Sequence, residues 1–330
     1  YLIHAYDDPV HAPLGLRPAR MYADIAPAAP HALHMPSHIF FAIGLWDRGA
    51  QSNVDSYEAA RTKARARDEG LSGGGFHALH WLHYARLQQG RHTDARAVLD
   101  TTHHYATAPT VATGYADYMR WYMPLASVMG TEQWDRLGPL LTQMEVDPST
   151  LEPRGAVSVH VGRGLAAAQQ GNLSAARTAL TQARDALGDD PSDALRIQIH
   201  ELDGLVALKD GEAERALEEL RTAAELEASR PLDFGPPFPV KPAPELYGEA
   251  LLALDRPADA LAQFDATLER YPDRALALWG KARAAAQADR PEVARAARTA
   301  LADQWSGADP AVRDRLQSLD GAMTSSTDAE

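Results

Sequence analysis

Histidine side chains recur at helical spacing in two stretches of the first third of the chain. His31, His34 and His38 lie three and four residues apart, and His77 and His80 repeat the same local pattern, His-Ala-Leu-His. Residues at positions i, i+3 and i+7 share one face of an α-helix, so each stretch presents its imidazoles together. Imidazole nitrogens are ligands for divalent transition metals, and the pattern indicates a site for zinc, iron or copper.

The elements that position these residues are helices. Apolar residues recur at spacings of three and four, alanine is abundant and strand patterns are scarce, which predicts an all-α fold. Each unit is expected to be a helix, a short turn and a second helix, with about six to seven pairs in an array. Turn residues are predicted every 34–46 residues, at Gly44, Gly90, Gly130, Gly171, Gly211, Asp255 and Asp289.

Helix boundaries follow from prolines, glycines and the apolar period. Pro36 allows two readings: it kinks a helix over 31–43, or it begins that helix and leaves His31 and His34 in the approach. Residues 1–8 read as the end of a helix. The other helices are expected at 13–25, 47–69, 76–89, 92–105, 110–129, 132–145, 155–170, 173–187, 192–209, 212–229, 245–254, 257–270, 274–288, 291–303 and 310–320.

Composition divides the chain into segments. We expect His-rich repeats over 1–110, beginning inside a repeat, central repeats over 111–230 and C-terminal repeats with a capping helix over 245–323. A proline-rich loop over 231–244 separates the last two, and a disordered tail is expected at 324–330.

The repeat pattern resembles the tetratricopeptide repeat family. The clearest unit runs Leu246-Tyr247-Gly248 with Ala260, Phe264 and Pro272 in register, where the family has a small residue, an alanine, an aromatic residue and a closing proline. The resemblance implies a right-handed superhelical solenoid whose first helices line a concave groove. It also implies that this groove binds a peptide, a protein or a small ligand.

Groove positions can be assigned through this resemblance. It places His31 with His77, His34 with His80, and His38 with Tyr84 in three rows that cross neighbouring repeats, and it puts Asn53 in an inward slot of a second helix. Lys241 in the proline-rich loop is expected to hold a ligand carboxylate. The ligand-binding residues predicted in this way are His31, Asn53, His77, Tyr84, Asp117, Arg120, Lys241 and Glu245.

The histidine-rich runs also resemble those of an uncharacterised bacterial tetratricopeptide group. That group carries His-Tyr-x-Ile-His-x-x-Asp followed by His-Met-Pro-Ser-His; here Tyr1 to Asp7 keep the first run without its leading His, which would precede residue 1. The site is therefore expected to be incomplete if that residue matters. The metal ligands predicted are His4, Asp7, His34, His38 and His80.

Composition excludes several classes of function. The net charge of −13 argues against nucleic acid binding, because phosphate contacts need a basic face. No apolar run is long enough to span a membrane, and the absence of cysteine excludes thiolate chemistry. Eleven of the 13 histidines lie in the first third, so any chemistry is expected there. We expect a soluble protein, with the cytoplasm and the periplasm both open.

Two functions remain open. A binding scaffold is favoured because no base–nucleophile pair or known enzyme motif occurs. The alternative is a metal-dependent enzyme, a hydrolase or an oxygen-handling one, that uses the histidine cluster. A pH-sensing role for clustered imidazoles is a third possibility. All of these need the imidazoles of the two repeats to converge within about 5 Å.

Overall fold

The computed structural model describes residues 2–108, 114–232 and 234–324, and within them the chain is helical, without a strand. Short 3-10 turns, η1 (Trp134–Arg136) and η2 (Pro148–Thr150), separate some of the helices. The helices are α1 (Leu2–Ala5), α2 (Ala12–Ile25), α3 (Pro30–His34), α4 (Pro36–Ala42), α5 (Trp46–Arg67), α6 (Gly73–Gln88), α7 (His92–Ala106), α8 (Gly114–Thr131), α9 (Leu137–Gln143), α10 (Pro153–Gln169), α11 (Leu173–Asp185), α12 (Asp193–Lys209), α13 (Ala213–Ser229), α14 (Ala243–Ala253), α15 (Pro257–Arg270), α16 (Ala275–Gln287), α17 (Pro291–Gln304) and α18 (Pro310–Thr324).

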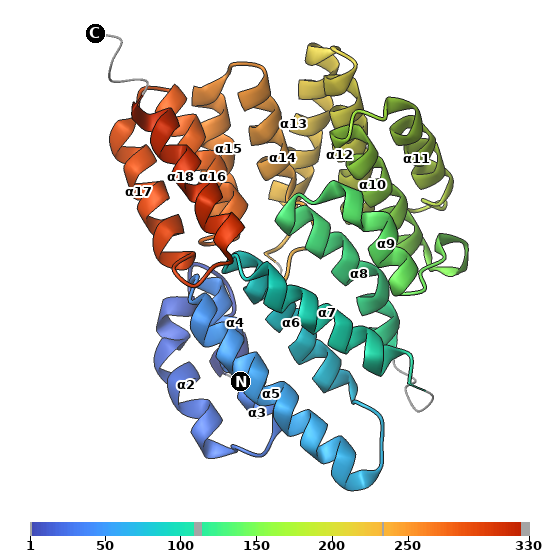
Figure 1. The fold of residues 1–330 in the computed structure, drawn as a ribbon, viewed down its shortest axis with the longest axis vertical. Coiled ribbons are helices and arrows are strands. Elements are labelled where there is room, and N and C mark those ends of the chain that lie inside the picture. Colours follow the sequence, from blue (N-terminus) through green and yellow to red (C-terminus); the bar gives the residue numbers. More distant parts are fainter. Residues whose placement is uncertain (1, 109–113, 233, 325–330) are drawn as a thin grey trace.

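Successive helices pair and the pairs stack into a solenoid, which confirms the predicted fold class. Pairs such as α12 with α13 and α16 with α17 pack along their length, and first helices such as α10 and α12 contact each other across repeats (Figure 1). Gly90, between α6 and α7, has φ +65°, a conformation that glycine adopts without the steric penalty of a side chain. The turn predicted at Gly130 is wrong: Gly130 lies inside α8 against Leu87, and Glu132 takes the positive φ.

Small residues let the helices of the C-terminal repeats approach closely. The ring of Phe264 on α15 is fully buried, and a Cβ on Gly248 or Gly280 would lie within 3.1 Å of it. The residue predicted as the aromatic of the clearest repeat therefore fills the space left by two glycines on neighbouring first helices. This packing explains why the pattern alternates a small residue with a large one.

The last repeats return to the first ones, so the solenoid closes on itself (Figure 1). The indole nitrogen of Trp46 donates to the carbonyl of Asp273 at 3.1 Å, and the indole nitrogen of Trp305 donates to the carbonyl of Gln88 at 3.0 Å. The amide of Asp309 donates to the carbonyl of Gly90 at 3.1 Å. These bonds join the start of α5, the end of α6 and the turn after α6 to the C-terminal repeats, although more than 200 residues separate them in the sequence.

The proline-rich segment between α13 and α14 crosses the interior of this closed solenoid. The hydroxyl of Tyr122 donates to the carbonyl of Pro237 at 2.7 Å. Gly235, with φ +88°, lies so close to Trp81 that a Cβ there would approach the indole to 2.4 Å. The segment therefore packs on α8 and on α6, the helix that carries His77.

The helix expected over 31–43 is two helices. Pro30 begins α3 and Pro36 begins α4, with Met35 between them, because Pro36 has no N–H to bond to the carbonyl of Ala32. The second reading of Pro36 is thus correct for α4, while His31 and His34 occupy a short helix of their own. Residues 325–330 of the expected tail lie outside the described residues. Residue 110, where a helix was expected to start, also lies outside them. The segment boundaries proposed from composition stay predictions.

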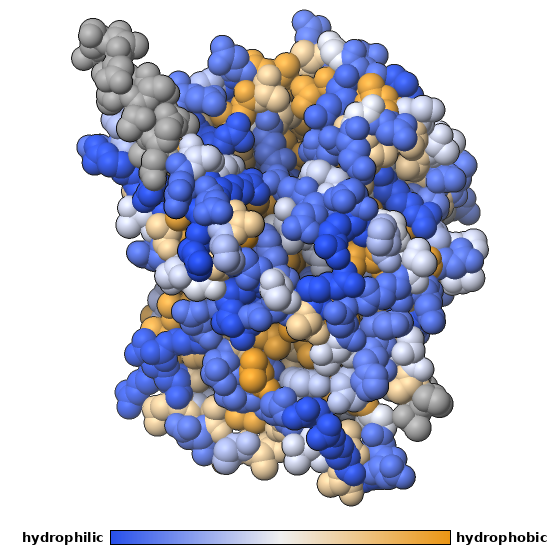
Figure 2. All heavy atoms as spheres, in the orientation of Figure 1, coloured by the Kyte–Doolittle hydropathy of each residue, from blue (hydrophilic) through white to orange (hydrophobic). Residues whose placement is uncertain are grey.

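The outer surface is mainly hydrophilic in the view of Figure 2, with apolar side chains visible in hollows between helices. Among the described residues, no helix is both long and apolar enough to cross a bilayer.

Candidate metal centre

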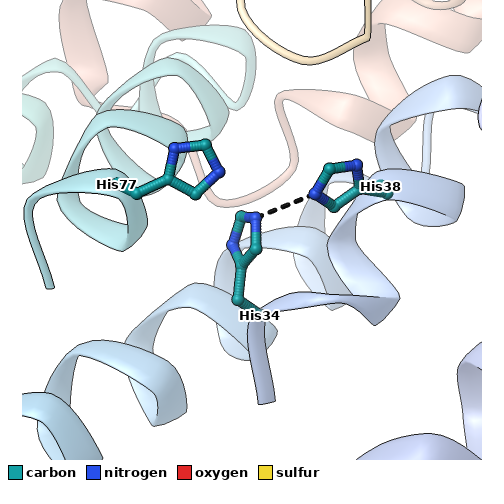
Figure 3. Close-up of side chains that lie close together, drawn as sticks. All are labelled: His34, His38 and His77. Atoms are coloured by element: carbon teal, nitrogen blue, oxygen red, sulfur yellow. Dashed lines mark hydrogen bonds between the residues drawn. The ribbon is translucent and has the colours of Figure 1, made fainter. Parts of the chain in front are cut away.

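Three imidazoles from two neighbouring repeats meet in the interior (Figure 3). The ring centroids of His34 and His38 are 4.9 Å apart, and those of His34 and His77 are 4.4 Å apart. One ligand nitrogen from each of the three residues lies within 4.8 Å of the other two. The convergence predicted from the sequence is therefore present, between α3, α4 and α6.

The pairs of residues that meet across the two repeats differ from the pairs expected from the sequence. His34 contacts His77, not His80, so α6 is offset by about one turn from the predicted register. His31 turns outward and is exposed, because the break at Pro36 separates the turn that carries it from α4. His34 and His38 stay inside, with 2% and 3% of their surface exposed. Trp81 forms an apolar wall for the cluster, with its ring 4.9 Å from His34 and 4.4 Å from His38.

The tautomer of His34 follows from its partner Asn53. The amide nitrogen of Asn53 donates to the carbonyl of Gly49 at 2.8 Å, which leaves its oxygen, Oδ1, facing Nδ1 of His34 at 2.7 Å. An amide oxygen only accepts, so Nδ1 of His34 carries the proton. Nε2 of His34 is then an unprotonated nitrogen.

The rings of His38 and His77 also have a polar partner at Nδ1. Nδ1 of His38 contacts Oδ2 of Asp7, a carboxylate that accepts, and Nδ1 of His77 lies 2.7 Å from the hydroxyl oxygen of Tyr115. All three Nδ1 atoms are thus engaged by polar groups behind the cluster. Asn53, Asp7 and Tyr115 have the position of the outer partners that orient histidine ligands in metal sites.

The inner nitrogens therefore face one another. Nε2 of His34 lies 3.0 Å from Nε2 of His38 (dashed line in Figure 3). Burial and then the neighbouring imidazoles His38 and His77 hold the pKa of His34 well below its usual value. Burial likewise lowers the pKa of His77 to about 4. Neutral imidazoles with free Nε2 atoms are the form that binds a metal ion.

A second group of possible ligands shares His38. His4, Asp7 and His38 each offer one atom within 4.8 Å of the others. His4 is exposed on α1, whereas the Asp7 side chain is only 4% exposed. The residues predicted from the resemblance, His4 and Asp7, therefore lie on the outer side of the same cluster.

His80 is buried beside the cluster but belongs to neither group of possible ligands. Its Nδ1 lies 2.9 Å from the hydroxyl of Tyr115, the residue that also contacts His77, and its Nε2 is buried without a partner. Burial keeps the pKa of His80 well below its usual value. Tyr115 was not predicted from the sequence, because it precedes the first groove position of its repeat and does not belong to a spaced histidine pattern.

Three of the predicted ligand-binding residues form a buried ionic network instead of an open groove. Arg274 donates to both carboxylate oxygens of Glu245, at 2.5 and 3.1 Å, and to the hydroxyl of Tyr84 at 3.2 Å. Lys241 lies 2.9 Å from Glu245 and also contacts Glu249. Burial alone would raise the pKa of the Glu245 carboxyl, but the charges of Arg274 and Lys241 lower this pKa to about 2. The interior face is closed at this point.

Asp117 and Arg120 stay near the surface. They line a pocket of about 450 Å³ together with Arg154, and Arg120 donates to the carbonyl of Met144 at 2.9 Å. His31 lines a different, largely apolar pocket of about 900 Å³ next to His4. The predicted ligand-binding residues thus fall into separate places on the molecule.

The stacked pairs make this chain an α-helical repeat protein. Within it, residues 248–309 match the model of the tetratricopeptide repeat family. Among solved structures, a tetratricopeptide repeat protein from Parabacteroides merdae is similar, with a TM-score of 0.48 and 12% identity over 88% of this chain and 98% of that chain. No curated protein matches the sequence.

Proposed function

We propose that this repeat scaffold binds one transition-metal ion through Nε2 of His34, His38 and His77. The observation that carries the proposal is the 3.0 Å separation between Nε2 of His34 and Nε2 of His38, in rings whose Nδ1 atoms are held by Asn53 and Asp7. Where both nitrogens present lone pairs at this distance they repel each other, and a cation between them removes the repulsion. Two nitrogens on a tetrahedral zinc ion lie about 3.3 Å apart, so a small outward shift of the rings would admit it.

Zinc suits this donor set best. Three neutral imidazoles at tetrahedral angles are a common zinc arrangement, with ligand bonds of about 2.0–2.1 Å. Iron and copper also bind imidazole, and copper binds it more tightly than zinc under equal availability. Asn53 and Asp7 hold the rings of His34 and His38 with Nδ1 turned away from the ion site, and Tyr115 contacts Nδ1 of His77, which lowers the reorganisation needed for binding.

The scaffold part of the function is the binding of a protein or peptide. Because the interior around Lys241 and Glu245 is closed by ion pairs, we place such a partner at the outer pocket of Asp117, Arg120 and Arg154. This pocket is lined by two guanidinium groups and by four carboxylates, those of Asp117, Glu145, Asp147 and Glu152, and so matches a peptide that carries both charges with the basic groups in excess. Charge reversal of Arg154 should weaken capture of such a peptide, whereas Arg295→Glu on an exposed face should not.

A metal-dependent hydrolase is the second candidate. Three protein ligands leave a fourth position for water, and a zinc-bound water loses its proton near pH 7. Turnover of a simple ester by the zinc-loaded protein, lost in His77→Gln, would favour this reading. No turnover above that of His77→Gln would leave a binding protein.

Cobalt substitution tests the metal proposal. A cobalt(II) ion held by three imidazoles and water in a tetrahedral site gives intense visible absorption bands, whereas a six-coordinate surface site gives weak ones. We expect the intense bands with the native chain and with the control His104→Gln, and we expect their loss in His34→Gln. Weak bands in all three proteins would contradict the proposed site.

A further inference from the structure

We infer that the centre takes a second divalent ion, bound by His4, Asp7 and Nδ1 of His38, so that the imidazole of His38 bridges two ions. The inference rests on the proposed function, because it assigns Nε2 of His38 to the first ion. It adds a binding site of different chemistry, with a carboxylate oxygen and two imidazole nitrogens as ligands.

The two nitrogens of His38 point into two different groups of ligands. Nε2 faces His34 at 3.0 Å, while Nδ1 contacts Asp7, and the ring centroid lies 5.4 Å from that of His4. The group of His4, Asp7 and His38 places one ligand atom of each residue within 4.8 Å of the others. His38 is the one residue that the two groups share.

Asp7 supplies an independent observation. Its Oδ2 contacts His38, but its Oδ1 is buried without a hydrogen-bond partner among the described residues, in a side chain that is 4% exposed. A buried carboxylate oxygen without a partner has lost its hydration without gaining a replacement contact. A cation on this side of His38 would supply that contact to Oδ1.

The local chain holds Asp7 in place. The next residue, Asp8, accepts hydrogen bonds at 3.0 Å from the amides of Val10 and His11 and so fixes the turn after α1. This turn directs Asp7 inward, toward α4. Asp8 itself contacts His11 and belongs to neither ligand group.

The two ions would differ in access. The first lies behind Trp81 between the buried rings of His34 and His38 and the half-buried His77, whereas the second has the exposed His4 as a ligand. Binding of the second ion replaces the proton on Nδ1 of His38, and this proton leaves to solvent, so each second ion releases one proton. Asp7 then changes from a hydrogen-bond acceptor to a ligand. We expect the second ion to bind more weakly and to exchange faster.

Copper(II) titration of the metal-free chain tests the inference, with bound copper counted by elemental analysis after gel filtration. We expect two ions per chain, and one in Asp7→Asn and in His4→Gln. Asp8→Asn is the matched control and should keep two, because an asparagine oxygen still accepts from Val10 and His11.

Electron paramagnetic resonance gives a second readout. Two copper ions bridged by one imidazolate couple magnetically, so the signal of the two-copper protein should be far below that of two isolated ions. His4→Gln should restore the full signal of one ion. One copper per chain in the native protein, or two in His4→Gln and Asp7→Asn, overturns the inference while the first site stands. No bound copper overturns both.

Discussion

Nε2 of His34 and Nε2 of His38 lie 3.0 Å apart in the interior, while Nδ1 of each ring is held from behind by Asn53 and Asp7. With its proton on Nδ1 facing Asn53, a neutral His34 offers the lone pair of Nε2 to this contact. Burial disfavours adding a second proton to His34. We propose that a metal ion occupies this contact, and the prediction for Asn53 follows from that proposal.

Asn53 should matter for metal affinity although it touches no ion. Asn53→Ala removes the acceptor that orients His34, and loss of such an outer partner typically weakens metal binding by about 10–100-fold. Competition with a coloured zinc chelator measures this affinity. Gln51→Ala, two residues away on the exposed face of α5, should leave it unchanged. Equal affinity in Asn53→Ala and the native chain would show that the tautomer of His34 is not set by this contact.

The buried network at the closure of the solenoid should be essential for stability. Arg274→Ala leaves Glu245 buried with one of its two cationic partners missing, and we expect a loss of about 3 kcal/mol in the free energy of unfolding. The double variant Arg274→Met/Glu245→Met should be more stable than Arg274→Ala, because no carboxylate is left there without its guanidinium. Urea denaturation measures both.

Arg295→Ala provides the surface comparison for this network. Arg295 pairs with Glu292 on the exposed side of α17, so its loss should change stability by less than about 0.5 kcal/mol. If Arg274→Ala were equally harmless, the network would not hold the closed solenoid together.

Gly235 should be intolerant of a side chain because of Trp81. Gly235→Ala brings a Cβ to within 2.4 Å of the indole, in addition to the strain of a positive φ. Gly188→Ala has the same kind of strain, at φ +74°, but meets nothing within 4 Å. We expect Gly235→Ala to be less stable than Gly188→Ala by about 1–3 kcal/mol and to shift the tryptophan fluorescence. Equal stabilities of Gly235→Ala and Gly188→Ala would mean that the proline-rich segment is not closely packed against α6.

Buried His83 should make the metal-free protein sensitive to acid. Burial lowers its pKa from 6.5 to about 3, and Nε2 lies 2.8 Å from the hydroxyl of Ser127. The unfolded chain therefore binds a proton that the folded chain does not, so stability falls as pH drops from about 6.5 toward 3. The slope contributed by one proton is about 1.4 kcal/mol per pH unit.

His83→Asn should lower the change in the free energy of unfolding per pH unit by about 1.4 kcal/mol, the contribution of one proton. Urea denaturation at several pH values between about 7 and 4, in the presence of a chelator, gives the comparison. Identical slopes for the two proteins would show that His83 is protonated in the folded state as well.

The repeats could be predicted from the sequence because their signals are local. The alternation of small residues with Phe264 gives the packing directly, and glycines such as Gly90 mark turns. Closure of the solenoid had no such signal. It depends on backbone carbonyls, such as that of Gln88, meeting Trp305 more than 200 residues later, and a carbonyl looks the same at every position.

The meeting of imidazoles from two repeats could be predicted from the sequence, but not which of them meet, since His80 was the metal ligand predicted on the second stretch and His77 is the residue that joins His34 and His38. His34, His38 and His77 stand out by type and spacing, yet their partners depend on the offset between α3 and α6, which Pro36 changes. Lys241 and Glu245 were assigned to a ligand-binding groove from their positions in the repeat. Such a position does not reveal whether another part of the chain contacts it, as Arg274 contacts Glu245 here.

The most direct test of the central claim is the zinc content and zinc affinity of the native chain beside His34→Gln/His77→Gln. His11→Gln/His104→Gln is the control, since it removes two histidines outside both ligand groups. We expect tight zinc binding by the native and control proteins and at least a 100-fold weaker affinity in His34→Gln/His77→Gln. Equal zinc binding by all three proteins would contradict it.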